Sequence, residues 1–185
     1  EVFALENGIP LGNVVQHAIS KDSMLFIATN VSGQVHAANR NSLKLKWTSA
    51  VPSPRYLLAD DYFVYATSWA GNYIYRIDRV NGAILDSLYA GGQTEAIALF
   101  DQKLWVSRGG YSQTDTVVSI DVQTGISELF TTGDMPQSFA IYNDELYVLC
   151  SGYTDWSTIN TLSSIWKYNE QLNQFELIQT SPDSN

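Results

Sequence analysis

Residues 52–90 contain the pattern that decides the fold, and they read PSPRYLLADDYFVYATSWAGNYIYRIDRVNGAILDSLYA. Four short runs in this stretch are rich in aromatic and aliphatic residues, and polar turns separate them, which is typical of β-strands. Asn81-Gly82 supplies the positive φ that a tight hairpin requires between the third run and the fourth. The stretch therefore predicts four antiparallel strands in succession, which we call strands A to D.

The same unit occurs four times along the chain. Its second strand is recognisable in each copy, as SMLFIATN (23–30), YFVYATSW (62–69), KLWVSRGG (103–110) and ELYVLCSG (145–152). A period of about 40 residues is typical of propellers and solenoids, in which one sheet cannot bury both of its faces and neighbours must stack. The repeat predicts an all-β propeller with about four four-stranded antiparallel blades. The strand aromatics expected to pack between blades are Phe63, Trp105, Tyr147 and Trp166.

The repeat also predicts the domain organisation. We expect a single propeller domain over residues 1–185, with an open set of blades. Such a set leaves sheet faces exposed, so further blades or a partner chain are expected to cover them. Successive blades are expected at 10–50, 51–90, 91–133 and 134–180, with 1–9 ending a preceding blade and 181–185 beginning a further one.

Charge excludes one class of partner. The chain has 10 lysine and arginine residues against 19 aspartate and glutamate residues, which gives a formal net charge of −9. Nucleic acid would be repelled rather than bound through counterion release. No apolar stretch is long enough to cross a bilayer, and residues 1–10 lack the basic and apolar regions of a signal peptide. An export signal or lipid anchor would therefore lie outside this chain.

The sequence offers no recognisable catalytic or metal-binding constellation. Cys150 stands alone in an apolar strand, and His17 and His36 have no metal-ligand spacing, so neither a disulfide nor a zinc site is expected. A calcium site in YSQTDT (111–116) or YTDWSTIN (153–160) lacks the spaced acidic series of a recognised loop. We expect a protein that is not an enzyme and holds no cofactor. Most aspartates are predicted to cap turns, namely Asp60, Asp61, Asp101 and Asp144 between strands A and B, and Asp78 and Asp121 at the C–D hairpins.

The unequal B–C loops carry the functional signal. They lengthen from NVSGQ (30–34) to CSGYTDWSTINTLS (150–163) and gather aromatic residues. In a propeller the D–A and B–C connections emerge on one face, so a binding surface is predicted there. A purely structural alternative is that Arg55 and Glu95 pair with each other and the loop aromatics cover the core. The residues expected to contact a ligand or partner are Gln16, Arg55, Trp69, Glu95, Arg108, Tyr111, Gln137, Tyr153 and Trp156.

Several longer runs resemble a known family. NGIPLGNVVQ (7–16), WAGNYIYRIDRVNG (69–82) and DMPQSFAIYNDELYVLCSG (134–152) are similar to the YncE-like, DUF5074 surface-layer-type propellers of bacteria. The resemblance implies a ring of seven or eight blades, exported to the periplasm or tethered at the outer-membrane surface through a lipid anchor. Some members of the family, the BtuG-like surface lipoproteins, capture vitamin B12.

The resemblance leaves two functions open. The first is capture of a small-molecule ligand, such as a corrinoid, for an outer-membrane transporter. The second is an accessory scaffold subunit that makes a protein–protein interface in an outer-membrane or secretion complex.

Overall fold

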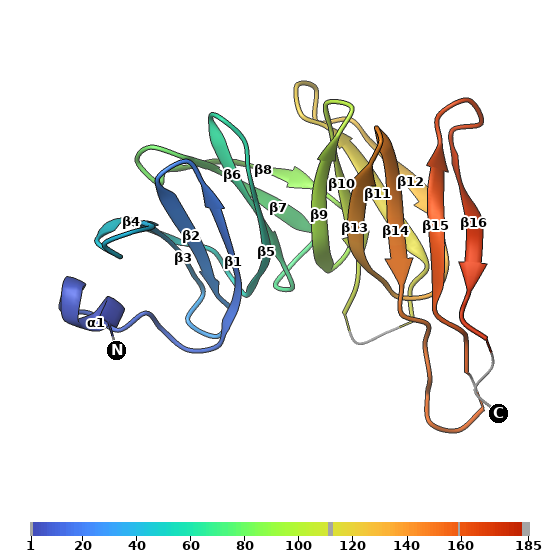
Figure 1. Cartoon of the computed structure of the whole chain (residues 1–185), viewed down its shortest axis with the longest axis horizontal. Coiled ribbons are helices and arrows are strands. Elements are labelled where there is room, and N and C mark those ends of the chain that lie inside the picture. Colours follow the sequence, from blue (N-terminus) through green and yellow to red (C-terminus); the bar gives the residue numbers. More distant parts are fainter. Residues whose placement is uncertain (1, 111–112, 159, 183–185) are drawn as a thin grey trace. The chain divides into compact units, whose positions relative to one another are not determined.

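Four antiparallel sheets account for almost all of the regular structure. The computed structural model describes residues 2–110, 113–158 and 160–182, and it contains sixteen strands and one short helix in these residues. Each sheet has four consecutive strands in the order A, B, C, D (Figure 1). The predicted all-β propeller architecture with four four-stranded blades is confirmed. The chain divides into an N-terminal unit, residues 1–91, and a C-terminal unit, residues 92–185.

The N-terminal unit contains the first two sheets, and the C-terminal unit contains the other two. The first sheet is β1 (Val15–Lys21), β2 (Met24–Thr29), β3 (Gln34–Asn39) and β4 (Leu45–Ala50). The second is β5 (Pro54–Ala59), β6 (Phe63–Ser68), β7 (Tyr73–Asp78) and β8 (Ile84–Tyr89). The third is β9 (Thr94–Phe100), β10 (Lys103–Arg108), β11 (Thr116–Asp121) and β12 (Ser127–Thr131). The fourth is β13 (Pro136–Tyr142), β14 (Glu145–Cys150), β15 (Ser164–Asn169) and β16 (Gln174–Thr180).

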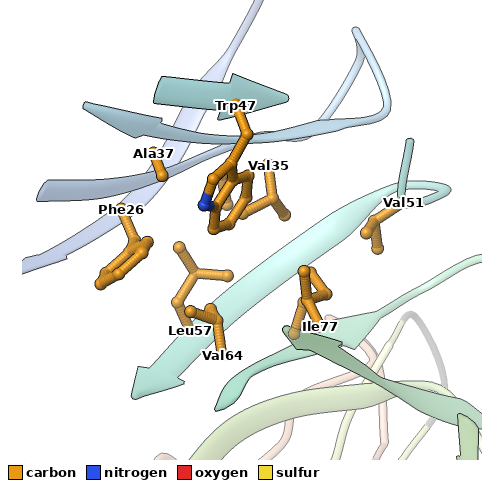
Figure 2. Close-up of a cluster of buried hydrophobic side chains, with 10 residues drawn as sticks. Phe26, Val35, Ala37, Trp47, Val51, Leu57, Val64 and Ile77 are labelled. Atoms are coloured by element: carbon orange, nitrogen blue, oxygen red, sulfur yellow. The ribbon is translucent and has the colours of Figure 1, made fainter. Parts of the chain in front are cut away.

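The core of the N-terminal unit lies between its two sheets. Phe26, Val35 and Trp47 of the first sheet pack with Leu57 and Val64 of the second in one buried cluster (Figure 2). The Trp47 indole nitrogen also donates a hydrogen bond to a backbone carbonyl in the β7–β8 hairpin, 3.1 Å away. Stacking of sheets therefore buries the apolar faces that one blade alone would leave in water.

The core of the C-terminal unit is an aromatic cluster centred on Trp105. Its ring centroid lies 4.5 Å from that of Tyr168, 5.1 Å from Phe130 and 5.6 Å from Phe175. Cys150 is fully buried in the same cluster, as the sequence predicted for a core thiol.

The four strand aromatics do not all pack as predicted. Trp105 lies in the core of the C-terminal unit, and Trp166 packs against that core. Phe63 is half-buried in the second sheet. Tyr147 is the exception. It points to the opposite face of β14 from Leu146 and Val148, which pack in the core, and its hydroxyl donates a hydrogen bond to Glu145.

One local motif recurs in every C–D hairpin. A side-chain oxygen of an asparagine or aspartate accepts hydrogen bonds from the backbone amides two and three residues later, at 2.7–3.2 Å. The fifth residue of the motif has a positive φ in all four copies, whether or not it is glycine. The four motifs begin at Asn39, Asp78, Asp121 and Asn169, and the positive-φ residues are Leu43, Gly82, Gly125 and Asn173.

Among the A–B turns, the turn after β5 uses its first aspartate as a cap, as the sequence predicted. The Asp60 carboxylate accepts hydrogen bonds from the backbone amides of Tyr62 and Phe63. Asp101 and Asp144 take positive φ, which aspartate tolerates better than most residues. Asp61 instead pairs with Lys21 at the end of β1, at 2.8 Å.

A short helix precedes the first sheet. It is α1, which spans Val2–Asn7 within the segment 1–9 that the sequence assigns to the end of a preceding blade. The Asn7 amide ties α1 to the β3–β4 hairpin, because it donates to the Leu43 carbonyl and accepts from the Leu45 amide. Phe3 of α1 is buried against His36 of β3. In the described residues no helix is long and apolar enough to cross a membrane.

Candidate functional site

Each sheet has a β-bulge where its first strand begins. The pairing register shifts between Val15 and His17 in β1, and between Pro54 and Leu57 in β5. It shifts at the same place in β9, opposite Val106 and Arg108, and between Pro136 and Ser138 in β13. A bulge leaves one residue out of the ladder and redirects its side chain. The residues within the four bulges include Gln16, Arg55, Glu95 and Gln137, all of which are among the contact residues expected from the sequence.

In the N-terminal unit the structure brings three predicted contact residues together. Nη1 of Arg55 donates a hydrogen bond to Oε1 of Gln16, at 2.6 Å. The Arg55 guanidinium carbon lies 3.8 Å from the ring centroid of Trp69, which follows β6 directly. A guanidinium held over an indole ring is a favourable cation–π arrangement. Gln16, Arg55 and Trp69 therefore form one ordered cluster, which we call the Arg55 cluster.

His17, which follows Gln16 in β1, makes a further contact between the first and the second sheet. Its Nδ1 accepts a hydrogen bond from the backbone amide of Leu57, at 3.1 Å, and its ring centroid lies 4.7 Å from that of Tyr56. The accepting Nδ1 fixes the neutral tautomer with its proton on Nε2. Burial lowers the pKa of His17 below its ordinary value. His17 thus joins strand A of the first sheet to strand A of the second.

The sequence analysis did not identify the hydroxyl groups that accept hydrogen bonds from backbone amides in two of the bulges. The Tyr56 amide donates to Oγ1 of Thr67 at 2.8 Å, and the Ala96 amide donates to Oγ of Ser107 at 2.9 Å. Thr67 and Ser107 occupy the same position in strand B of their sheets. A hydroxyl at that position in both the second and the third repeat is the signal that could have revealed these bonds.

In the C-terminal unit Glu95 and Arg108 lie next to glycines. Glu95 is only 4% exposed, and a Cβ on Gly109 would lie 3.0 Å from the Cβ of Glu95. A Cβ on Gly92 would lie 2.6 Å from Nε of Arg108. Both glycines therefore leave space that a neighbouring charged side chain occupies. Gln137 is half-buried in β13.

The β14–β15 loop presents its tryptophan to solvent. Trp156 is 92% exposed and has a φ of 63°, a left-handed conformation that tryptophan rarely adopts. The loop is closed by a bridge between Thr154 and Asn160, and the Thr161 amide donates to the Tyr153 carbonyl at 2.8 Å. We call residues 153–158, 160 and 161 the Trp156 loop.

A capping aspartate fixes the tip of the Trp156 loop. One oxygen of Asp155 accepts from the amides of Ser157 and Thr158, both at 2.9 Å, and the other accepts from the hydroxyls of the same two residues. The Trp156 amide itself donates to Oγ1 of Thr154 at 3.1 Å. Hydrogen bonds therefore compensate the strained backbone at the exposed ring.

Two predicted contact residues, Tyr153 and Tyr111, remain to be placed, and the cavities lie at other residues. Tyr153 is half-buried at the base of the Trp156 loop, and Tyr111 lies outside the described residues. Four cavities of the molecule are lined by residues other than the nine predicted contacts, and the one beside β14 and β15 has a volume of about 350 Å³. Over the described ranges, no group of three or more His, Cys, Asp or Glu side chains is placed to hold a metal ion.

Comparison with known proteins supports the fold. Neither a protein-family model nor a curated protein matches this chain. Among solved structures, hydrazine synthase of Kuenenia stuttgartiensis is similar, with a TM-score of 0.73 and 16% identity over 92% of this chain and 48% of that chain. The Pan2 WD40 domain of Neurospora crassa has a TM-score of 0.67 and 14% identity over 91% of this chain and 52% of that one. This chain is a β-propeller.

A third similar structure is an enzyme. The dihydro-heme d1 dehydrogenase NirN, solved in complex with DHE, has a TM-score of 0.67 and 11% identity over 92% of this chain and 37% of that chain. The chain thus spans about half the length, or less, of these three solved propellers. At such low identity the likeness shows the fold alone, since unrelated functions share this scaffold.

Proposed function

We propose that this chain is a non-enzymatic binding propeller whose main contact with a partner protein is the Trp156 loop. The exposure of Trp156 carries the proposal. An indole ring that is 92% exposed contributes little to the stability of its own chain, whereas tryptophan is among the residues that contribute most when buried in a protein interface. The matching function is the scaffold subunit, at the outer-membrane surface or in the periplasm.

The order of the loop supports the same proposal. Binding costs free energy when it immobilises a flexible contact segment, and a segment already held in one conformation avoids most of that cost. Asp155 holds the tip of the Trp156 loop through four hydrogen bonds, and Thr161 holds its base through bonds to Tyr153. Backbone strain at an exposed side chain is also a feature that clusters at functional sites.

Site-specific photocrosslinking tests the proposal. A benzophenone amino acid replaces Trp156 in the protein produced in its native host, and the same amino acid replaces Tyr62 as the matched control. Tyr62 is 74% exposed in the β5–β6 turn. We expect one discrete crosslinked protein from position 156 and none from position 62. Equal labelling from both positions, or no product from position 156, would contradict a partner contact at this loop.

The Arg55 cluster favours a second candidate, capture of a small ligand. An arginine stacked on a tryptophan and bonded to Gln16 offers flat apolar area together with directed polar groups, as ligand sites require. Under this candidate the chain delivers a corrinoid to an outer-membrane transporter. Calorimetric titration with cobalamin tests it: heat that disappears in Trp69→Ala supports capture, and no heat at high micromolar ligand removes the corrinoid version.

A further inference from the structure

The charge of the chain is distributed unequally between its two units. Residues 92–185 contain 12 of the 19 aspartates and glutamates but only 3 of the 10 lysines and arginines, so their net charge is −9. Residues 1–91 contain the other 7 acidic and the other 7 basic residues, so their net charge is zero. The C-terminal unit, which contains the Trp156 loop, therefore carries the whole net charge of the chain.

The basic residues of the C-terminal unit lie mostly away from the Trp156 loop. No lysine, arginine or histidine occurs in residues 109–166, which include the loop and 7 acidic residues. Lys103 begins β10, and Nζ of Lys167 donates a hydrogen bond to Glu145, which begins β14. Both cations thus lie toward the A–B turns, whereas the loop lies at the other end of its sheet. In the part of the unit that the structure describes, Arg108 at the end of β10 is the one basic residue close to a B–C loop.

Three aspartates lie at the same end of the C-terminal unit as Trp156. Asp155 belongs to the Trp156 loop itself. The Asp134 carbonyl accepts a hydrogen bond from the amide of Gly152, which directly precedes the loop, at 3.1 Å. The Asp115 carbonyl accepts from the Thr132 amide at 2.7 Å, which places Asp115 beside the segment that leads to Asp134. The Asp115 side chain is exposed, and the other two are half-buried. The surroundings of the exposed indole are therefore acidic.

We propose that the partner protein of the Trp156 loop presents a basic surface, in which lysine and arginine side chains surround an apolar recess for the Trp156 ring. The inference rests on the proposed function and names the kind of partner. Protein interfaces bury aromatic residues at their centre and keep charges at the rim, where opposite potentials speed encounter and exclude wrong partners. The 92% exposed indole supplies the centre of the contact, and the three aspartates supply its rim. A guanidinium group of the partner can also stack on the indole.

The same charge argues against a bilayer as the surface that Trp156 contacts. Tryptophan is enriched at membrane interfaces, so an exposed indole alone would suit either surface. Anionic lipid headgroups attract basic segments, however, and a unit with a net charge of −9 would be repelled by them. Charge complementarity therefore favours a basic protein.

Photocrosslinking from position 156 tests the inference when it is repeated at two salt concentrations. The chain with a benzophenone amino acid at position 156 is incubated with an extract of its native host at about 0.1 M and about 1 M NaCl, between which the Debye length falls from about 10 Å to about 3 Å. We expect the yield of the discrete product to fall about tenfold or more, because screening removes the electrostatic attraction. Mass spectrometry should place the crosslink in a segment of the partner with an excess of lysine and arginine.

Charge variants connect the salt effect to the loop end of the unit. Asp115→Asn combined with Asp134→Asn should lower the yield at about 0.1 M NaCl by about threefold or more, since each change removes an ion pair at the rim. The matched control is Asp101→Asn combined with Asp144→Asn, which removes the same charge from the A–B turns. Both control positions have a positive φ, which asparagine tolerates. The control should leave the yield unchanged, and thermal melting establishes that the variants are folded.

The outcomes separate this inference from the proposed function. A product whose yield responds neither to salt nor to the loop variants overturns the basic partner and leaves the Trp156 contact intact. No product at either salt concentration contradicts the contact itself, and the inference with it. Cosedimentation with vesicles of phosphatidylcholine and phosphatidylglycerol that is lost in Trp156→Ala would overturn a protein partner in favour of a bilayer.

Discussion

Nδ1 of His17 accepts a hydrogen bond from the backbone amide of Leu57, 3.1 Å away, and this bond joins the first strands of two neighbouring sheets. A protonated imidazole carries a hydrogen on both nitrogens and cannot accept that bond. The stability of the N-terminal unit is therefore coupled to the protonation of His17.

The first prediction is a loss of stability at acid pH. Burial lowers the pKa of both His17 and His36 below the ordinary value of 6.5. Well above pH 6.5 both histidines are neutral in the folded and the unfolded chain, and stability is at its full value. As the pH falls below 6.5 the unfolded chain takes up protons first, so stability decreases. Chemical denaturation at pH 8, 7, 6 and 5 measures this, and His17→Gln should reduce the pH dependence. An unchanged dependence in His17→Gln would assign it to His36 or to other groups.

The second prediction concerns the close approach of Gly82 to Trp47. Gly82 has a φ of 78°, and a Cβ there would lie 2.7 Å from a carbon of the Trp47 indole. Gly82→Ala should destabilise the protein by about 2–4 kcal/mol, because backbone strain and overpacking act together. The control is Gly8→Ala, at a φ of 69° with no atom within 4 Å. Urea denaturation should show a clearly smaller loss for the control.

The third prediction concerns Leu43, which has a φ of 57° in the β3–β4 hairpin. Gly82 and Gly125 occupy the same position in the next two hairpins. Leu43→Gly should raise the free energy of unfolding by up to about 1 kcal/mol, since a left-handed conformation costs a leucine 1–2 kcal/mol and the half-buried side chain offsets part of the gain. Chemical denaturation measures the change, and a loss would show that packing of Leu43 exceeds its strain.

The fourth prediction compares two tryptophans in the C-terminal unit. Trp105 is fully buried and contacts Phe130, Tyr168 and Phe175, so Trp105→Ala should cost about 3–5 kcal/mol through the cavity that it leaves. Trp156→Ala should change stability by less than about 0.5 kcal/mol, because its ring is in solvent. Thermal melting of both variants tests this contrast. A large loss in Trp156→Ala would mean that the ring packs on the protein.

The repeat made the sheets predictable, because each strand repeats a burial pattern that the apolar residues record directly. The conformation of the C–D hairpins could be predicted from the sequence only in part. Glycine marks a positive φ at 82 and 125, but Leu43 adopts the same conformation and its residue type gives no sign of it. The information lies instead in the capping residues, since an asparagine or aspartate opens all four hairpins.

The positions of the candidate site residues along the repeat could be predicted from the sequence, whereas the contacts between their side chains could not. Counting along the repeat placed Gln16 and Arg55 near the start of strand A in successive repeats, and the structure joins them by a hydrogen bond. Stacking of Arg55 on Trp69 depends on the rotamers of two long side chains, which sequence spacing does not determine. The outward direction of Trp156 depends on the turn that Asp155 caps. Residue type alone suggests an aromatic contact there without showing which way the ring points.

The four bulges have a consequence for how this chain can change during evolution. Side chains elsewhere in the strands are tied to one face of a sheet, and a substitution there alters the packing between blades. The residues at the bulges are exempt from that alternation, and the chain already carries glutamine, arginine and glutamate at equivalent bulges in successive repeats. Recognition chemistry at these positions can therefore diversify from one repeat to the next while the scaffold stays the same.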